Sequence, residues 1–134
     1  MLDKFYDDEK AKLILRLTVG VLMLFHGVAK ILNPGSLEFI GSSLSNIGLP
    51  AFFAYAVYIG EVVAPLMIIS GFKARLGGLL LVITMIVAVV LVHLGDIFSL
   101  SKHGGLALEL QIFFLMGGLL VTMFGSGKFA LKPD

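Results

Sequence analysis

Five ionisable side chains stand inside long apolar stretches of this sequence, where water cannot solvate them. They are His26 and Lys30 in the first stretch, Glu61 in the second, His93 at the end of the third and Glu109 near the start of the fourth. An ionised side chain at the centre of a bilayer costs about 2.5–3.5 kcal/mol even on lenient insertion scales. Such groups therefore face inward and pair, and each is by default a functional candidate.

The five residues include both hydrogen-bond acceptors and donors, so they are able to satisfy one another. His26 and Lys30 are four residues apart and share a helical face. Tyr58, three residues before Glu61, is expected to bring a hydroxyl to the same face as the carboxyl. A glutamate in this setting is either paired with a cation or protonated, and the sequence leaves both states open.

This set of residues suits a quinone, which needs an apolar slot open to lipid and a histidine or carboxyl that hydrogen-bonds and protonates its oxygens. The catalytic candidates are Glu61, His26 and Glu109. The cofactor-binding candidates are His26, Lys30, Tyr58, Glu61 and His93. Aromatic side chains of AFFAYAVY (51–58) and Phe113–Phe114 either line such a slot or serve as ordinary packing.

Other chemistries have weaker motifs. Helical bundles build carboxylate–histidine metal sites, but the Glu-x-x-His pairs of di-iron bundles are absent, so no residue is assigned to a metal. A haem held by His26 and His93 would rest on two histidines alone. A proton or solute path through the membrane would need polar groups in the inner half of the spans, which is nearly bare.

Composition places the chain in a membrane. Of its 134 residues, 58% are hydrophobic and 14% charged, whereas soluble domains are about 45–50% apolar and about 25% charged. The length predicts a single domain over residues 1–134. No separate run of basic residues points to nucleic acid. The absence of cysteine excludes a dithiol relay within the chain, so the redox centre of any electron transfer would come from a partner or a bound cofactor.

Four stretches, about 12–32, 51–71, 74–94 and 105–125, are long enough to cross a bilayer core, which takes about 20 apolar residues. They predict an all-α, four-helix membrane bundle, because helices satisfy their own backbone groups in lipid. Glycine pairs at 77–78 and 117–118 predict close packing of the third and fourth spans. The start MLDKFYDDEKAK mixes both charge signs and is not a secretory signal, so we expect the first helix to remain.

Positive charges give the bundle a direction. Eight of the ten Lys and Arg residues fall on one side, namely Lys4, Lys10, Lys12, Arg16, Lys73, Arg75, Lys128 and Lys132. The positive-inside rule then places both termini in the cytoplasm. Arg16 and Arg75 are expected to snorkel to the cytoplasmic interface, and the polar candidates fall at the midplane or in the outer half.

The connection 33–50 is long for a tight turn. Leu37, Ile40, Leu44 and Ile47 are near a helical spacing, with Ser36 as the expected N-cap. This pattern predicts a short amphipathic helix on the outer surface or folded over the bundle. An irregular loop is the alternative.

The sequence resembles the DoxX family, whose founding relatives include the small membrane subunit of thiosulfate–quinone oxidoreductase. The pieces that carry the resemblance run along the chain: RLTVG and FHGVAK in the first span, GLP (48–50), GE (60–61), SGFKAR (70–75), MIVAVVLVH (85–93), GGLALEL (104–110) and GSGKF (125–129). The embedded polar residues of the family map onto Arg16, His26, Lys30, Glu61, His93 and Glu109. Leu108 stands where the family often has an aromatic residue, and the ending is reduced to ALKPD.

The resemblance implies a multi-pass protein of a bacterial or archaeal cytoplasmic membrane, some of whose relatives are redox subunits acting on quinone. We therefore expect a membrane subunit of an oxidoreductase system with a partner protein that carries the redox chemistry. The alternatives are a non-enzymatic accessory or assembly protein and a module that binds or transports a small ligand or metal. Self-association into a homo-oligomer is left open.

Overall fold

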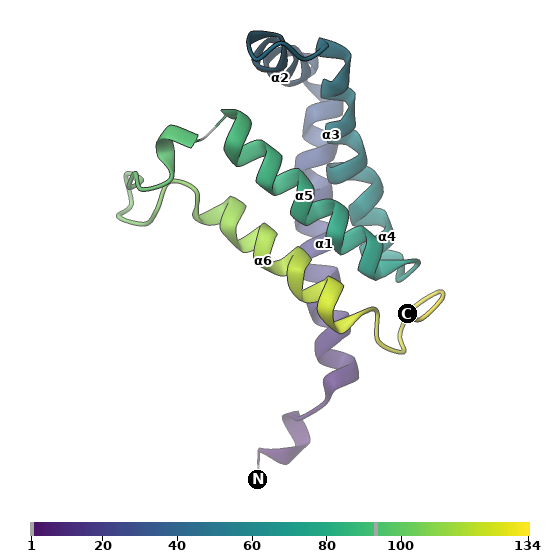
Figure 1. The fold of residues 1–134 in the computed structure, drawn as a ribbon. Helices are drawn as coiled ribbons and strands as arrows, with labels where there is room; N and C mark the ends of the chain where they lie inside the picture. Colours follow the sequence, from purple (N-terminus) through teal and green to yellow (C-terminus); the bar gives the residue numbers. More distant parts are fainter. Residues whose placement is uncertain (1, 93) are drawn as a thin grey trace.

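The structure, a computed structural model, describes residues 2–92 and 94–134. It is helical throughout these ranges apart from short turns, the loop 97–108 and the C-terminal residues 125–134 (Figure 1). Its main helices are α1 (Asp8–Leu32), α2 (Pro34–Asn46), α3 (Ala56–Tyr58), α4 (Ala64–Ser70), α5 (Ala74–Val92) and α6 (Glu109–Phe124). Shorter elements are the 3₁₀ turns η1 (Asp3–Phe5), η2 (Ala51–Tyr55) and η4 (Leu94–Asp96) and the π-helical turn η3 (Ile59–Val63). The described residues contain no strand, only two isolated bridges.

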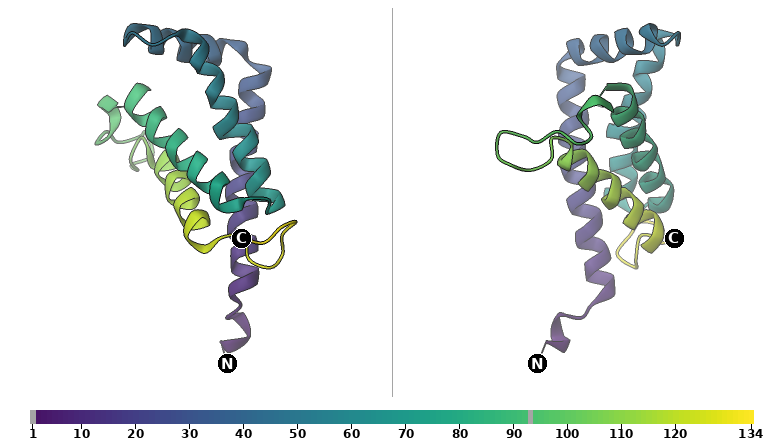
Figure 2. Two further views of the ribbon diagram at one scale, coloured as in Figure 1. Left: turned by 45° about the vertical axis from the view of Figure 1, so that its right-hand side comes forward. Right: turned by 60° about the vertical axis from the view of Figure 1, so that its left-hand side comes forward.

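The helix predicted in the 33–50 connection is α2, and it lies across one end of the bundle (Figures 1 and 2). The expected N-cap, Ser36, is wrong. Pro34 begins the helix instead, because its fixed φ suits the first turn and it has no N–H to leave unpaired there. Asn33 is both the C-cap of α1 and the N-cap of α2, so a single residue separates the two helices.

The second span is continuous from residue 51 to 70 but is not a regular α-helix, because it runs through η2, α3, η3 and α4. Pro65 has no N–H to donate to the carbonyl of Glu61. The N–H of Ala64 donates to the carbonyl of Ile59, five residues back, which makes η3 a π turn. Such turns are rare and concentrate at functional sites.

Three helices in the described residues are long and apolar enough to cross a membrane: Asp8–Leu32, Ala51–Ser70 and Ala74–Leu91, with 25, 20 and 18 residues. The protein is therefore a multi-pass membrane protein whose helices contact lipid. The apolar helix α6 begins at Glu109 rather than at Gly105, so it is shorter than predicted. Residues 105–108 belong to a loop in which the N–H of Ala107 donates to the carbonyl of Ser99 at 2.8 Å.

Helices α5 and α6 pack backbone against backbone, as the glycine pairs predicted. A Cβ atom on Gly78 would lie 2.6 Å from the carbonyl oxygen of Gly118, and one on Gly118 would lie 2.9 Å from that of Gly78. Side chains larger than hydrogen would force the helices apart. The core around this contact is apolar and includes Val19, Ile68, Leu81, Phe114 and Val121.

Two arginines hold the end of the bundle opposite α2, which we call the tail end and which comprises residues 71–75 and 125–134. Arg16 is 1% exposed and donates to the carbonyls of Ile68 and Ile69 at 2.9 Å. Arg75 donates to the carbonyls of Thr122 and Met123 at 2.9 Å. Each guanidinium thus satisfies carbonyls that a helix end leaves unpaired.

The expectation that Arg16 snorkels to the interface is wrong. Its Nη1 also donates to the carbonyls of Ser126 and Phe129, at 2.8 and 2.7 Å, so the tail covers it. Arg75 is exposed, as expected, and its Nε donates to the carbonyl of Asp134 at 2.9 Å. The C-terminal tail is therefore part of the folded structure.

Candidate functional site

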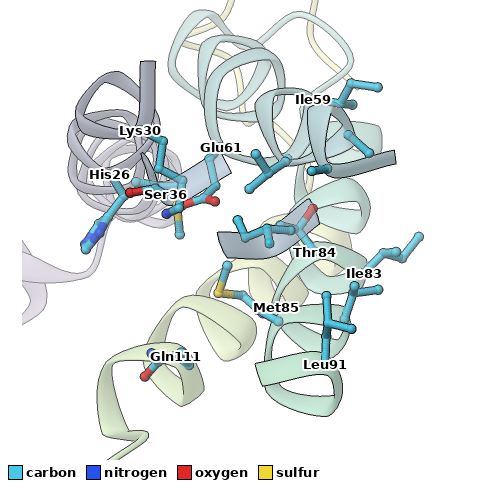
Figure 3. Close-up of a pocket in the computed structure, with 18 of the residues that line it drawn as sticks. His26, Lys30, Ser36, Ile59, Glu61, Ile83, Thr84, Met85, Leu91 and Gln111 are labelled. Atoms are coloured by element: carbon cyan, nitrogen blue, oxygen red, sulfur yellow. The ribbon is translucent and has the colours of Figure 1, made fainter. Parts of the chain in front are cut away.

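A cavity of about 800 Å³ lies near the α2 end of the bundle, where five segments surround it: α1, α2, the helix 51–70, α5 and α6. Most of its lining is apolar, with Met23, Phe53, Met85 and Phe114 among the larger side chains. The polar lining residues are His26, Lys30, Ser36, Glu61, Thr84 and Gln111, drawn in Figure 3. Its volume and composition are those of a site for a mainly apolar molecule with a few polar atoms.

The rim of the cavity between η3 and α5 is apolar. Ile59, Ile83 and Val87 line it and are 50%, 49% and 50% exposed. On a membrane-spanning helix such exposed apolar side chains face lipid. A molecule dissolved in the bilayer therefore meets an apolar entrance rather than a barrier of charge.

Lys30 and Glu61 form an ion pair inside this cavity. The Nζ of Lys30 donates to Oε1 of Glu61 at 2.7 Å, and the two side chains point toward one another in Figure 3. The Glu61 side chain is 6% exposed and that of Lys30 is 25% exposed. Of the two states that the sequence left open for Glu61, the structure shows pairing with a cation.

Local backbone geometry places Glu61 against α1. A Cβ on Gly27 would collide with the carbonyl oxygen of Glu61, the oxygen that Pro65 leaves without its helical partner. A Cβ on Gly60 would collide with the hydroxyl of Thr84 on α5. The π turn therefore lies between two helices that reach it only because glycine stands at each contact.

His26, a residue of α1, contacts α6. Its ring meets the ring of Phe114 edge-on, with centroids 5.5 Å apart and planes at 85°. Phe114 is buried, and both side chains line the cavity. The imidazole is thus held by an aromatic contact one helical turn from Lys30 on the same helix.

The other predicted site residues do not join this cluster. Tyr58 stacks edge-on against Tyr55, with centroids 6.1 Å apart, and is outside the cavity lining. The π turn widens the helix, so the three-residue spacing to Glu61 no longer means a shared face. Glu109 is exposed in the first turn of α6 and is also outside the lining. His93 lies outside the described residues.

Sequence reasoning overlooked three polar residues of the cavity: Ser36, Thr84 and Gln111. The sequence predicts Ser36 only as a helix cap, and Thr84 donates to the carbonyl of Leu80 at 2.8 Å. The Oε1 atom of Gln111 is buried and has no hydrogen-bond partner within residues 2–92 and 94–134. The available signal was position, because Gln111 is a polar residue in an apolar stretch, three residues before Phe114.

In the part of the chain that the structure describes, no three His, Asp or Glu side chains gather as metal ligands would. The charged groups of the cavity are an ammonium and a carboxylate already bonded to each other, with an imidazole nearby. Such a set can donate hydrogen bonds to a carbonyl oxygen and exchange protons with it. It suits acid–base chemistry on an apolar ligand.

Fold and site together define a multi-pass helical membrane protein with a mainly apolar cavity that contains one ion pair. The chain belongs to the DoxX family, whose model matches residues 11–94. A curated relative is "Putative oxidoreductase CatD" of Bacillus subtilis (strain 168), 31% identical over 126 residues that cover 93% of this chain and 87% of the relative. No solved structure matches the chain.

Proposed function

We propose that this protein is the quinone-binding membrane subunit of an oxidoreductase system. The observation that carries the proposal is the Lys30–Glu61 ion pair at 2.7 Å inside an apolar cavity with an apolar rim. A quinone is itself an apolar ring with polar oxygens and reaches proteins through the bilayer. The relative named as an oxidoreductase supports a redox role for the system.

Each polar residue has a definite task in this proposal. Lys30 donates a hydrogen bond to a quinone oxygen, and Glu61 holds the ammonium in place. Reduction of a quinone to a quinol takes two electrons and two protons. His26 is one group able to pass a proton to a ring oxygen, and Glu61 becomes another once it takes a proton from the Lys30 ammonium. The absence of cysteine leaves a partner protein or a bound cofactor as the source of the electrons, and we assign them to a partner protein that bears a redox cofactor.

The proposal also includes the number of spans and their orientation in the membrane. We place α6 as the fourth span and both termini in the cytoplasm of a bacterial or archaeal cell, on the strength of the charge bias. The cavity then lies in the outer half of the cytoplasmic membrane, and the tail end faces the cytoplasm. A cytoplasmic reporter fused to the C-terminus tests this orientation directly.

Binding measurements in nanodiscs test the function. The wild type should bind a decyl-tailed benzoquinone, and Ala88→Phe, which fills the cavity from α5, should abolish binding. Val90→Phe is the matched control, because Val90 is 59% exposed and outside the lining. Absence of quinone binding by the wild type contradicts the proposal. It then favours an accessory protein whose ion pair only fixes helix register.

A further inference from the structure

Gln111 presents an unmet hydrogen bond at the cavity. Its Oε1 is buried and has no partner among the residues that the structure describes, although the side chain lines the cavity. Buried polar atoms in native proteins are nearly always paired, and leaving one unpaired costs about 1–3 kcal/mol. Gln111 lines the cavity, and a turn about the soft terminal torsion of its side chain would bring this oxygen to a ligand that supplies the partner.

The position of Gln111 relative to the ion pair follows from the ring contact of His26 with Phe114. The two rings are 5.5 Å apart and join α1 to α6. Lys30 lies four residues after His26, and Gln111 lies three residues before Phe114. Each is therefore about one helical turn, about 5 Å, from the ring contact.

Lys30 and Gln111 both lie farther from the tail end than the ring contact does, because α1 begins near the tail end and α6 ends there (Figure 1). Lys30 and Gln111 thus lie at a similar level on two helices that the rings hold together. Figure 3 shows Gln111 on α6, across the cavity from Glu61, with Met85 between them. The thioether of Met85 is flexible enough to yield to a ring.

We infer that Gln111 is a second hydrogen-bonding residue for the cavity ligand, so that the ligand is a ring with oxygen substituents at two positions. One oxygen accepts a hydrogen bond from Lys30, which Glu61 holds in place, and the other meets Gln111. This inference rests on the proposed function and adds to it a binding residue for the second oxygen of the quinone ring. An amide both donates and accepts, so Gln111 serves the carbonyl and the hydroxyl forms alike.

A site built to bond a substrate hydroxyl discriminates against the analogue that lacks it, because its own polar group is then left unpaired. The decisive experiment compares a decyl hydroquinone with decyl phenols that lack either one of its hydroxyls, bound to protein in nanodiscs under anaerobic, reducing conditions. The wild type should bind the hydroquinone about tenfold tighter than the phenols. In Gln111→Met the preference over the phenol that lacks the hydroxyl facing Gln111 should shrink to about twofold or less, whereas the preference over the phenol that lacks the oxygen facing Lys30 should persist.

Two further measurements separate binding from folding. Gln111→Met should raise the melting temperature of the ligand-free protein, because it removes a buried unpaired oxygen. Thr122→Val is the matched control. It deletes a hydroxyl on the same helix, outside the cavity lining, that is already bonded to the carbonyl of Gly118, and it should keep the wild-type preference. Gln111→Leu replaces the methionine variant where the latter does not fold.

The outcomes are distinct. Loss, in the Gln111 variant, of the preference over the phenol that lacks the hydroxyl facing Gln111 supports the inference if Thr122→Val retains that preference. Equal binding of hydroquinone and phenols by the wild type, or an undiminished preference in the Gln111 variant, overturns it while the proposed function stands. A wild type that binds neither the hydroquinone nor the benzoquinone overturns the proposed function as well.

Discussion

The Nζ of Lys30 on α1 lies 2.7 Å from Oε1 of Glu61 in the π turn η3. This contact joins the first span to the most irregular part of the second, at a place where the Glu61 side chain is 6% exposed. A buried pair adds little net stability compared with an apolar pair of the same shape, but removing one partner leaves an uncompensated charge. The effect on stability of replacing either residue therefore depends on whether the other is present.

Single substitutions of the pair should be costly and the double substitution less so. We expect Lys30→Met to destabilise the protein by about 3–5 kcal/mol, because the Glu61 carboxylate loses its cation while it remains buried. Lys30→Met combined with Glu61→Leu should recover most of that loss. Reversible unfolding in mixed micelles, read by circular dichroism, measures the whole cycle.

Glu61→Leu should be milder than Lys30→Met, since the unpaired ammonium that it leaves is 25% exposed and is able to reach solvent or headgroups. If the losses of unfolding free energy in the two single variants simply add in the double variant, the two charges do not depend on each other in the folded protein.

Gly27 tests the close approach of α1 to the π turn. We expect Gly27→Ala to destabilise the protein by about 1–3 kcal/mol, because the new methyl collides with the carbonyl of Glu61 and pushes the helices apart. It should also weaken quinone binding by moving Lys30 away from Glu61. Thermal unfolding and ligand titration of the same nanodisc sample report both effects.

Gly35→Ala is the control for that substitution. No heavy atom lies within 4 Å of a Cβ built at Gly35, which is a residue of the helix α2. Alanine there should be neutral or slightly stabilising, since it reduces the freedom of the unfolded chain. Equal losses at both glycines would mean that the contact with Glu61 is not what constrains Gly27.

Asp7 gives a pH dependence at the start of α1, on the solvent side of the spans. Its carboxylate accepts a hydrogen bond from the N–H of Lys10 at 3.0 Å, which lowers the pKa of Asp7 below its ordinary value of 3.8. The cap is therefore fully present above pH 3.8 and is lost as the pH falls through the lowered pKa. The chemical shift of the Lys10 amide should follow this titration in the wild type and stay flat in Asp7→Asn.

Much of the cavity was predictable from the sequence, because the cost of burying charge in lipid forces partners to exist. His26 and Lys30 share a face through their spacing of four, and Glu61 was the carboxyl available in the neighbouring span. The family membership and the helical membrane fold were predictable as well. The inference from the spacing of His26 and Lys30 depends on regular α-helix geometry, which α1 has.

The departures arise where local geometry is irregular or where a distant segment intervenes. Tyr58 was assigned to the face of Glu61 by α-helical spacing, which the π turn breaks. Glu109 was placed inside a span that begins at Glu109 itself, because residues 105–108 bond to the preceding loop. Gln111 carries no charge, so the cost of burying an ionised group does not single it out.

Arg16 was mistaken for a snorkelling residue because nothing local shows that the C-terminal tail returns to cover it. Its guanidinium binds the carbonyls of Ile68 and Ile69 on one side and those of Ser126 and Phe129 on the other. A lysine has no planar fork and cannot serve both sets at once. We expect Arg16→Lys to destabilise the protein by about 3 kcal/mol or more.

The same substitution should release the tail. Amides in 126–131 should exchange with deuterium faster in Arg16→Lys than in the wild type, because the carbonyls of Ser126 and Phe129 lose their donor. Arg75→Lys is the comparison, since its guanidinium caps α6 and holds Asp134 from an exposed position, where water replaces lost bonds at lower cost. The larger effect should therefore come from Arg16. Equal effects of the two substitutions, or unchanged exchange in the tail, would show that burial of the Arg16 guanidinium is not what joins the tail to the bundle.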